Sequence, residues 1–256
     1  ELNRRKFIKG ATGAAGAVVA GQLIGTHKSW ASANDTIRIA VIGVRGRGRS
    51  HINGHQPQPG VEVVTLCDPD ENILRQRAEE FGKQYNKKFH TETDLRKVLD
   101  DKNIDAVSIA TPNHWHSLAA IWACQVGKDV YVEKPGSHNI YEGRKMVEAA
   151  HKYGRIVQHG VQLRSSPAIQ EAVQHLRNGL IGDVYLARGL CFRWRKSIGK
   201  KPVKPVPKHL HYDLWLGPAE YRPYTENIVH YNWHWHWDFG NGDVGNQGIH
   251  QTDMCM

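Results

Sequence analysis

The chain has 256 residues, of which 40% are hydrophobic and 23% are charged. These proportions are typical of a soluble globular protein, and the length suffices for one large domain or two modest ones. The formal net charge of +9 first suggests a nucleic-acid partner, but residues 1–33 alone contribute +4. Much of the remainder lies in a loop interleaved with prolines, at Lys196, Lys200, Lys201, Lys204 and Lys208. Because no dense basic stripe or nucleic-acid module accompanies these charges, we expect no nucleic-acid partner.

The N-terminal residues resemble a targeting segment rather than part of a fold. Arg4 and Arg5 begin a twin-arginine pattern, and the apolar run from residue 10 to 25 is too short for the roughly 20 residues of a spanning helix. Ala31-Ser32-Ala33 fits a cleavage site. We therefore expect residues 1–33 to be a twin-arginine export signal, recognised by the twin-arginine export machinery, and the protein to be periplasmic or secreted. A basic N-terminal arm is the alternative.

Strand-like and helix-like stretches alternate through residues 34–158. Apolar, β-branched runs predict strands at 37–42, 61–66, 106–110 and 130–132, with another starting at 156–157. Helices are predicted at 70–81, 93–99, 116–126 and 140–153, with Asp70 as a cap and with Gly127 and Gly154 as terminators. This alternation predicts βαβ units and a parallel sheet, in an α/β doubly wound Rossmann domain spanning 34–158.

The pattern changes after residue 158. One helix is expected after Pro167, then a long strand at 184–194, then a loop marked by Pro202, Pro205 and Pro207. Residues 159–256 therefore resemble the first part of an α+β substrate domain. No later strands complete a second sheet before Met256, so we expect this domain to be truncated.

A glycine-rich turn, Gly43-Val44-Arg45-Gly46-Arg47-Gly48, follows the first predicted strand. Glycines at such a turn let the backbone approach a dinucleotide pyrophosphate, which rests on a helix N-terminus. Arg45 breaks the usual G-x-G-x-x-G spacing, but Asp68 ends the next predicted strand, where an acidic residue accepts hydrogen bonds from ribose hydroxyls. The turn and Asp68 together predict a dinucleotide site; a glycine turn that binds nothing is the alternative.

The charge of Asp68 disfavours the 2′-phosphate of NADP, so NAD is the expected cofactor. Arg45, Arg47 and Arg49 are each able to pair with a phosphate, which leaves NADP open.

Three more segments carry a family resemblance: Thr111-Pro112-Asn113-His114-Trp115-His116, Glu133-Lys134-Pro135, and residues 242–250, which read GDVGNQGIH. Two of them follow predicted strands, where doubly wound sheets bind ligands. With the glycine turn, they resemble the glucose–fructose oxidoreductase, inositol dehydrogenase and rhizopine-catabolism (Gfo/Idh/MocA) family. The resemblance covers residues 37–253 and is strongest to the exported members with a twin-arginine signal.

The resemblance implies roles for particular residues. It assigns cofactor contacts to Thr111, Asn113, His116 and Glu133, in addition to the glycine turn. Lys134 matches the family's lysine, which stabilises a developing alkoxide, and His250 matches its general base. Asn246 stands where the family has an aspartate, and an amide is able to orient a substrate but carries no charge. His114 and His116 are equally consistent with helix-capping roles.

Tryptophan and histidine alternate in Trp233-His234-Trp235-His236-Trp237-Asp238. In an extended chain the tryptophans would share one face, and the histidines and Asp238 the other. Packing between domains, a platform for a sugar ring and a metal site all fit this pattern. We predict no metal site and place Trp235 and His236 among the substrate contacts, with Lys134 and His250.

The resemblance implies an NAD(P)-dependent oxidoreductase that acts on a secondary hydroxyl or ketone of a sugar or cyclitol. In the family, the α+β domain carries a large open sheet that binds substrate and makes oligomer contacts, so a homo-oligomer is expected when the protein is full length. Export in folded form implies a tightly bound cofactor. The alternative is a glycoside hydrolase or lyase that oxidises its sugar transiently with the same cofactor. A sugar-binding protein without enzymatic activity is a third possibility.

Overall fold

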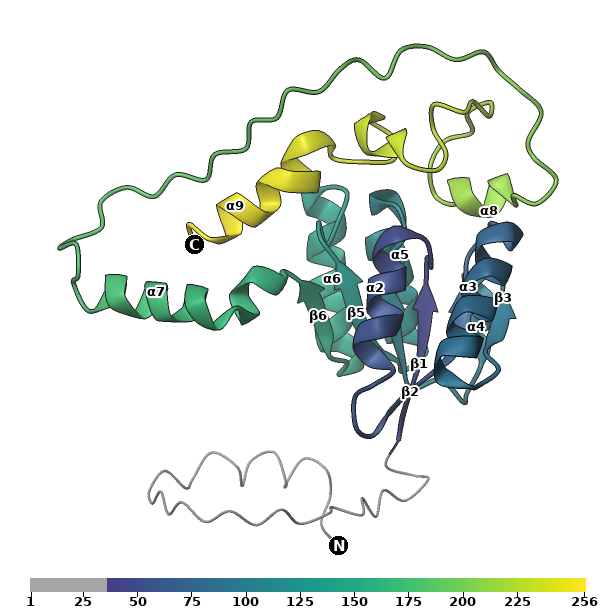
Figure 1. The fold of residues 1–256 in the computed structure, drawn as a ribbon, viewed down its shortest axis with the longest axis horizontal. Helices are drawn as coiled ribbons and strands as arrows, with labels where there is room; N and C mark the ends of the chain where they lie inside the picture. The colour runs from purple at the N-terminus through teal and green to yellow at the C-terminus, as the bar shows by residue number, and fades with distance from the viewer. Residues whose placement is uncertain (1–35) are drawn as a thin grey trace, which may run out of the picture. The chain divides into compact units, whose positions relative to one another are not determined.

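The computed structural model describes residues 36–256, and the export signal expected at 1–33 lies outside them. A six-stranded parallel sheet has the order β3-β2-β1-β4-β5-β6, which is the doubly wound order of a Rossmann domain (Figure 1). The predicted α/β class is therefore confirmed. The strand order reverses between β1 and β4, which is where such sheets bind ligands. The strands are β1 (Ile37–Ile42), β2 (Val61–Cys67), β3 (His90–Glu92), β4 (Ala106–Ile109), β5 (Asp129–Glu133) and β6 (Val157–Gly160).

Helices cover both faces of this sheet because alternate strand residues carry apolar side chains to opposite sides. On one face, Ala40, Ile42 and Val107 pack with residues of α4, α5 and α6. On the other, Val41 and Val63 pack with α2 and α3. The helices are α2 (Gly46–His55), α3 (Glu71–Tyr85), α4 (Leu95–Asp100), α5 (Asn113–Gln125) and α6 (Ile140–Tyr153).

The ends of these helices follow local capping chemistry. Asp70 caps α3 by accepting hydrogen bonds from the N–H groups of Asn72 and Ile73, and Gly154 ends α6 in the left-handed conformation, both as predicted. Helix α4 begins two residues later than expected because Asp94 is its cap. Helix α5 begins three residues earlier than expected, directly after Pro112, which brings Asn113 and His116 into its first turn.

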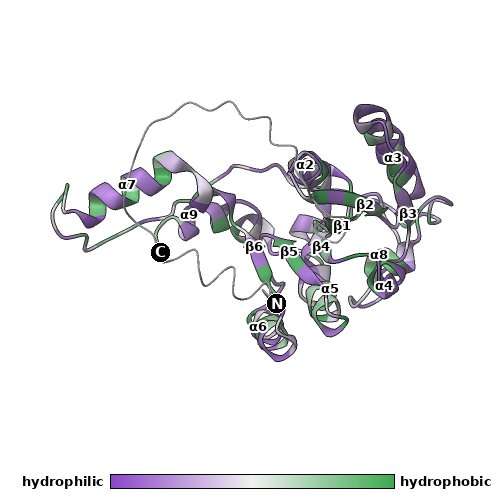
Figure 2. Ribbon diagram, turned by 90° about the horizontal axis from the view of Figure 1, so that it is seen from below, coloured by the Kyte–Doolittle hydropathy of each residue, from purple (hydrophilic) through white to green (hydrophobic). Residues whose placement is uncertain are grey.

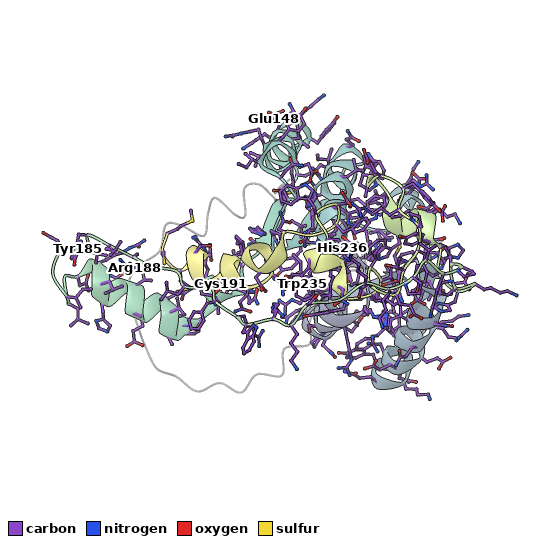
Figure 3. All side chains as sticks on the ribbon, turned by 90° about the horizontal axis from the view of Figure 1, so that it is seen from above. Glu148, Tyr185, Arg188, Cys191, Trp235 and His236 are labelled. Carbon is purple, nitrogen blue, oxygen red and sulfur yellow. The ribbon has the colours of Figure 1, made fainter. Side chains whose placement is uncertain are left out.

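The segment after β6 departs from the expected strand at 184–194. The 3₁₀ turn η1 (Gln162–Ser165) and helix α7 (Pro167–Arg177), whose hydrophobic and hydrophilic residues alternate in Figure 2, lead into a long stretch without regular structure. Tyr185 is 96% exposed and Trp194 is 97% exposed, and Figure 3 shows Tyr185 and Arg188 on this stretch. The prediction was wrong because a strand needs partner N–H and C=O groups, and residues 36–256 supply none here.

Residues 209–240 form a small apolar core of their own. Tyr212, Trp215 and Phe239 are buried in it, and the ring centroids of Trp215 and Phe239 lie 5.0 Å apart. The elements in and after this segment are helix α8 (Tyr212–Leu216), the 3₁₀ turn η2 (Asn232–Trp235), the π-helical turn η3 (Val244–Gly248) and helix α9 (Ile249–Asp253). Across the described chain, no helix combines the length and apolar character needed to cross a membrane.

Candidate active site

In the glycine turn after β1, two glycines pack against neighbouring backbone and a third has free space around its Cα. Gly43 has φ +81°, and a Cβ there would lie 2.7 Å from the carbonyl oxygen of Ala110. A Cβ on Gly48 would lie 1.7 Å from the carbonyl oxygen of Gly43, so only glycine lets α2 pack this closely on the turn. Gly46 differs, since no atom outside its own stretch of helix lies within 4 Å of its Cβ position and the residue lines a cavity. The backbone at Gly46 is therefore accessible to a ligand.

Asp68, directly after β2, supports this turn. One of its carboxylate oxygens accepts a hydrogen bond from the N–H of Val44 at 2.9 Å, and the other accepts one from the N–H of Asp70 at 3.0 Å. Burial raises the pKa of Asp68 to about 6, although these two N–H groups favour its charged form. Each oxygen keeps a further lone pair for a ribose hydroxyl.

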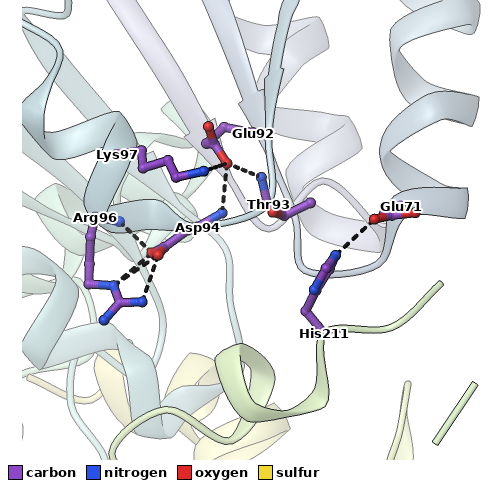
Figure 4. A network of polar contacts seen from close by, with 7 residues as sticks. All are labelled: Glu71, Glu92, Thr93, Asp94, Arg96, Lys97 and His211. Carbon is purple, nitrogen blue, oxygen red and sulfur yellow. Dashed lines mark hydrogen bonds and ion pairs between the residues drawn. The ribbon is translucent and has the colours of Figure 1, made fainter. Parts of the chain in front are cut away.

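The turn between β3 and α4 forms one wall beside Asp68. Glu92 accepts hydrogen bonds from the N–H groups of Thr93 and Asp94, and Lys97 pairs with the same carboxylate (Figure 4). Asp94 in turn accepts hydrogen bonds from the backbone and guanidinium of Arg96. These contacts fix the shape of a corner whose residues 93–96 line the cavity.

Asp70 joins the segment 209–240 to the Rossmann domain. Its carboxylate accepts hydrogen bonds from His209 Nδ1 and pairs with His230 Nε2, each at 2.9 Å. A carboxylate 3% exposed would carry a raised pKa from burial alone, but these two imidazoles hold the pKa of Asp70 well below its usual range. Figure 4 shows a further contact at this corner, between His211 and Glu71 at 2.8 Å.

A buried charged group lies at the carboxyl end of β5. Glu133 accepts hydrogen bonds from Arg47 Nε at 2.6 Å and His51 Nε2 at 3.0 Å. Burial alone would raise the pKa of Glu133, but the hydrogen bonds from His51 and Arg47 lower it to about 2. The Glu133 carboxylate is therefore ionised and ties the glycine turn to β5.

Lys134 reaches from the end of β5 to the turn η3. Its Nζ donates to the carbonyl oxygen of Asn246 at 2.7 Å and lies 3.4 Å from the side-chain oxygen of the same residue. Burial lowers the pKa of Lys134, and the nearby Glu133 carboxylate partly restores it. Because both amino acids line the cavity, a cation and an amide face the same space.

One cavity of about 690 Å³ contains the glycine turn, Asp68, Lys134 and Asn246. The structure thus brings together most of the residues that the sequence singled out. Those that line the cavity are Gly43, Arg45, Gly46, Arg47, Asp68, Thr111, Asn113, His116, Glu133, Lys134 and Asn246. Their roles stay predictions.

Four of the predicted site residues do not line the cavity. Gly48 packs against Gly43, and His250 lies on α9 with a pKa lowered by burial and by the charge of Lys134. Trp235 lies beneath the guanidinium of Arg195, 4.7 Å from the ring centroid, and His236 Nε2 lies 3.0 Å from the carbonyl oxygen of Asn227 (Figure 3).

The expected extended conformation of residues 233–238 was wrong. The 3₁₀ turn η2 covers residues 232–235, so side chains no longer alternate between two faces. It places Trp233 and His234 in the cavity instead of Trp235 and His236, while Trp237 is 90% exposed. Among residues 36–256, no group of three or more His, Cys, Asp or Glu side chains is placed to hold a metal ion.

The first turn of α5 carries two buried histidines that contact backbone carbonyl oxygens, and one of them also lines the cavity. His116 has Nδ1 2.6 Å from the carbonyl oxygen of Pro135 and Nε2 2.9 Å from that of Thr111, so its ring links the ends of β4 and β5. His114, whose pKa burial lowers to about 4, contacts the carbonyl oxygens of Trp215 and Phe239 and does not line the cavity. Both histidines therefore hold the structure together.

Two observations fit a dinucleotide in this cavity. The open Cβ position of Gly46 leaves room for a pyrophosphate, and Thr111 presents a buried hydroxyl with no hydrogen-bond partner in the described chain. Asp68 offers acceptors for a ribose, at the switch point where such folds bind nucleotides. The residues present thus match the donors and acceptors of NAD.

Comparison with known protein families also indicates a nucleotide-binding oxidoreductase. Residues 37–161 match the family model for the oxidoreductase family, NAD-binding Rossmann fold, and residues 168–255 match that for the oxidoreductase family, C-terminal alpha/beta domain. The chain belongs to this oxidoreductase family. The Gfo/Idh/MocA resemblance noted from the sequence is thereby confirmed.

Individual relatives include dehydrogenases and glycosidases. The chain is 33% identical to scyllo-inositol 2-dehydrogenase (NAD(+)) of Bacillus subtilis over 60% of this chain and 44% of that protein. It is 27% identical to levoglucosan dehydrogenase of Pseudarthrobacter phenanthrenivorans, with 68% and 49% covered. It is 30% identical to a glycosyl hydrolase family 109 protein of Saccharopolyspora erythraea, with 61% and 35% covered. The chain thus spans about a third to a half of these relatives.

Two solved structures share the fold of part of this chain. Myo-inositol 2-dehydrogenase of Lactobacillus plantarum superposes with a TM-score of 0.53 at 28% identity, over 58% of this chain and 43% of that one. The WlbA dehydrogenase of Bordetella pertussis, solved with NADH and UDP-GlcNAcA, superposes with a TM-score of 0.52 at 26% identity, over 56% and 43%.

Sequence reasoning missed several residues of the site. Trp233 and His234 belong to the tryptophan–histidine segment, but its alternation does not distinguish them from Trp235 and His236, which were predicted instead. His209 and His230 gave no signal, because their partner Asp70 was interpreted only as a helix cap. His51 gave none either, since a histidine within a helix predicts no contact with a distant glutamate.

Proposed function

We propose that this protein is an NAD-dependent oxidoreductase that oxidises a secondary hydroxyl of a sugar or cyclitol, or reduces the matching ketone. The observation that carries the proposal is that one cavity contains both the dinucleotide-type turn with Asp68 and the Lys134–Asn246 pair. A polyol hydroxyl placed beside Lys134 would lie in the same cavity as the cofactor. Relatives named as scyllo-inositol and levoglucosan dehydrogenases support this substrate class.

NAD, when bound, supplies the acceptor for the hydride of the carbinol carbon. Lys134 would donate a hydrogen bond to the substrate oxygen and stabilise its developing negative charge. Asn246 holds Lys134 through its backbone carbonyl, so the ammonium stays directed at the cavity. The family resemblance assigns the proton acceptor to His250, and that assignment stays a prediction, because its ring is outside the cavity lining.

The rival proposal is a glycosidase that oxidises its sugar only transiently. The similarity to a glycosyl hydrolase family 109 protein favours it as the second candidate. Oxidation beside a glycosidic carbon acidifies the neighbouring C–H and allows elimination. Such an enzyme returns its cofactor unchanged, whereas a dehydrogenase accumulates NADH or a keto product.

The experiment is to purify the full-length protein, denature it and identify the released small molecules by mass spectrometry. The proposal predicts NAD(H), and incubation with a panel of polyols should convert NAD to NADH with an equal yield of ketone. Release of glycoside aglycone with no net change in NADH would favour the rival. Protein that neither carries nor binds NAD would refute both.

We further propose that the protein is exported in folded form with its cofactor bound, and that the full-length protein is a homo-oligomer. Support for export is the twin-arginine pattern at Arg4 and Arg5. Fractionation should find the protein outside the cytoplasm, and Arg4→Lys together with Arg5→Lys should retain it inside. If the doubly substituted protein is exported as efficiently, another route carries it.

A further inference from the structure

The segment that carries His250 is anchored on both sides of that residue. Asn246, four positions before it, accepts a hydrogen bond from Lys134 through its backbone carbonyl at 2.7 Å. Asp253, three positions after it, accepts hydrogen bonds from Arg164, whose Nε contacts the two carboxylate oxygens at 2.8 Å and 3.0 Å. His250 thus lies between two polar contacts, which connect η3 and α9 to the segments that follow strands β5 and β6.

Arg164 is fixed by hydrogen bonds of its own. It lies in the turn η1, shortly after β6, where its N–H donates to the carbonyl oxygen of Val161 at 3.2 Å. Its carbonyl oxygen accepts a hydrogen bond from the side chain of Gln170 on α7 at 2.9 Å. The Asp253 side chain that it holds is only 11% exposed. A planar guanidinium that meets a largely buried carboxylate therefore defines where the end of α9 lies.

The helical spacing of α9 extends this contact to His250. Residues three apart on a helix are neighbours on one face, with about 5–6 Å between their Cβ atoms. His250 and Asp253 have this spacing within α9. Because Arg164 holds the Asp253 face of α9 against η1, the imidazole is directed to the same side, toward the ends of β5 and β6.

Several charges act on this imidazole. Burial lowers the pKa of His250, and the cations Lys134 and Arg47 lower it further. The carboxylates of Glu133 and Asp253 act in the opposite direction. A cation that compensates the charge of Asp253 therefore favours the neutral imidazole, which is the form able to accept a proton.

We propose that Arg164 is a positioning residue of the reaction, which holds His250 toward the ends of β5 and β6 and compensates the charge of Asp253 beside the imidazole. The proposal rests on the proposed oxidoreductase function and keeps His250 as the proton acceptor. Arg164 does not line the cavity, so it acts through Asp253. His159 on β6 is a second reporter of this pair, since burial lowers its pKa and Asp253 and Arg164 act on it in opposite directions.

The first test follows the His250 ring and needs no catalysis. Histidine ring resonances of the isotope-labelled full-length protein are recorded by NMR over a range of pH, with His250 assigned from His250→Gln. Arg164→Gln leaves the Asp253 carboxylate uncompensated and should raise the pKa of His250. Asp253→Asn removes that carboxylate and should lower it. A contact that only supports the fold would expose the ring in both variants and raise its pKa in both.

These two directions decide the first test. A pKa of His250 that does not rise in Arg164→Gln, or does not fall in Asp253→Asn, would overturn the proposal. Arg177→Gln is the matched control, because it removes the same charge from the exposed end of α7 and should leave the His250 titration unchanged.

The second test is single-turnover reduction of bound NAD by myo-inositol, scyllo-inositol and levoglucosan. Arg164→Gln should slow this step by about 10–10²-fold and move the rise of the rate to higher pH, with NAD affinity kept. Arg164→Lys keeps the cation, so the rise should stay at its original pH even where the rate falls. If the rise moves as far in Arg164→Lys as in Arg164→Gln, the compensation of charge is refuted.

The two tests separate this proposal from the proposed function. If no polyol reduces NAD in any variant while the His250 titrations shift as predicted, the proposed function is wrong and the action of Arg164 on His250 stands. If NAD is reduced with the same rate and pH dependence in Arg164→Gln as in the unaltered protein, the function stands and the positioning role is refuted.

Discussion

Lys134 and Asn246 are joined across the cavity by a hydrogen bond of 2.7 Å from the ammonium to a backbone carbonyl. These residues are 112 positions apart in the chain, and one follows a Rossmann strand while the other belongs to the π-helical turn η3. The bond uses the backbone of Asn246, so the replacement of the family's aspartate by asparagine leaves this contact possible. It links the nucleotide half of the cavity to the half expected to hold the substrate.

Two glycines of the turn after β1 should respond differently to the same substitution. Gly48→Ala should destabilise the fold, since its Cβ would clash with the Gly43 carbonyl. Gly46→Ala should fold with a nearly unchanged melting temperature, because its Cβ position is open and the residue is the first of α2. It should nevertheless bind NAD about tenfold more weakly, through contact with the pyrophosphate. Calorimetry of both variants, unliganded and with NAD, separates the two effects; equal NAD affinity in Gly46→Ala would place the pyrophosphate elsewhere.

Asp68 should make NAD binding depend on pH. Its pKa is raised to about 6, and the ionised form is the better acceptor for ribose hydroxyls, so NAD affinity should rise as pH increases through about 6. Because the folded-state pKa exceeds the ordinary value, stability of the unliganded protein should fall over the same range. Titration calorimetry at several pH values measures the first effect.

Asp68→Ser should flatten that pH profile, weaken NAD and relatively improve NADP. It should also cost about 1–3 kcal/mol of stability, because Val44 and Asp70 lose the acceptor for their N–H groups. The exposed Glu79→Ser on α3 serves as the control and should leave both profiles unchanged. If the unaltered protein already prefers NADP, the arginines of the glycine turn outweigh Asp68.

The contact between Asp70 and His230 should slow the release of NAD. It holds segment 209–240 against the corner between β2 and α3, beside Asp68. His230→Gln should raise the release rate about tenfold, which corresponds to about 1.4 kcal/mol. Lys204→Gln breaks an exposed ion pair with Glu226 and should have no such effect. Stopped-flow displacement of NADH by excess NAD measures both; equal rates in the two variants would show that this contact does not retain the cofactor.

The Rossmann domain was predictable because its signals are local. Buried parallel strands such as β1 and β4 are short, mostly apolar runs, and Asp70 and Gly154 mark helix ends by their own chemistry. Strand β3, of three residues, is too short to give a pattern. The glycine turn and Asp68 were found because such sites lie where strands end, and Lys134 was found through the family resemblance of its Glu-Lys-Pro segment.

What the sequence could not predict depends on contacts between distant residues. Residues 184–194 have strand composition, but composition does not supply a partner strand. The alternation in residues 233–238 predicted an extended chain, but residues 232–235 form a 3₁₀ turn, in which the rings of Trp233 and Tyr231 pack on His234. The pairing of Asp70 with His230 spans 160 positions, and no local pattern encodes it.

The measurement that tests the central claim most directly is single-turnover reduction of bound NAD by polyols in the full-length protein, compared with Lys134→Ala. We predict a burst of NADH in the unaltered protein and a rate about 10²–10⁴ lower in Lys134→Ala, with NAD affinity largely kept. If Lys134→Ala reduces its cofactor as fast as the unaltered protein, Lys134 does not stabilise the reacting oxygen and this account of the site is wrong.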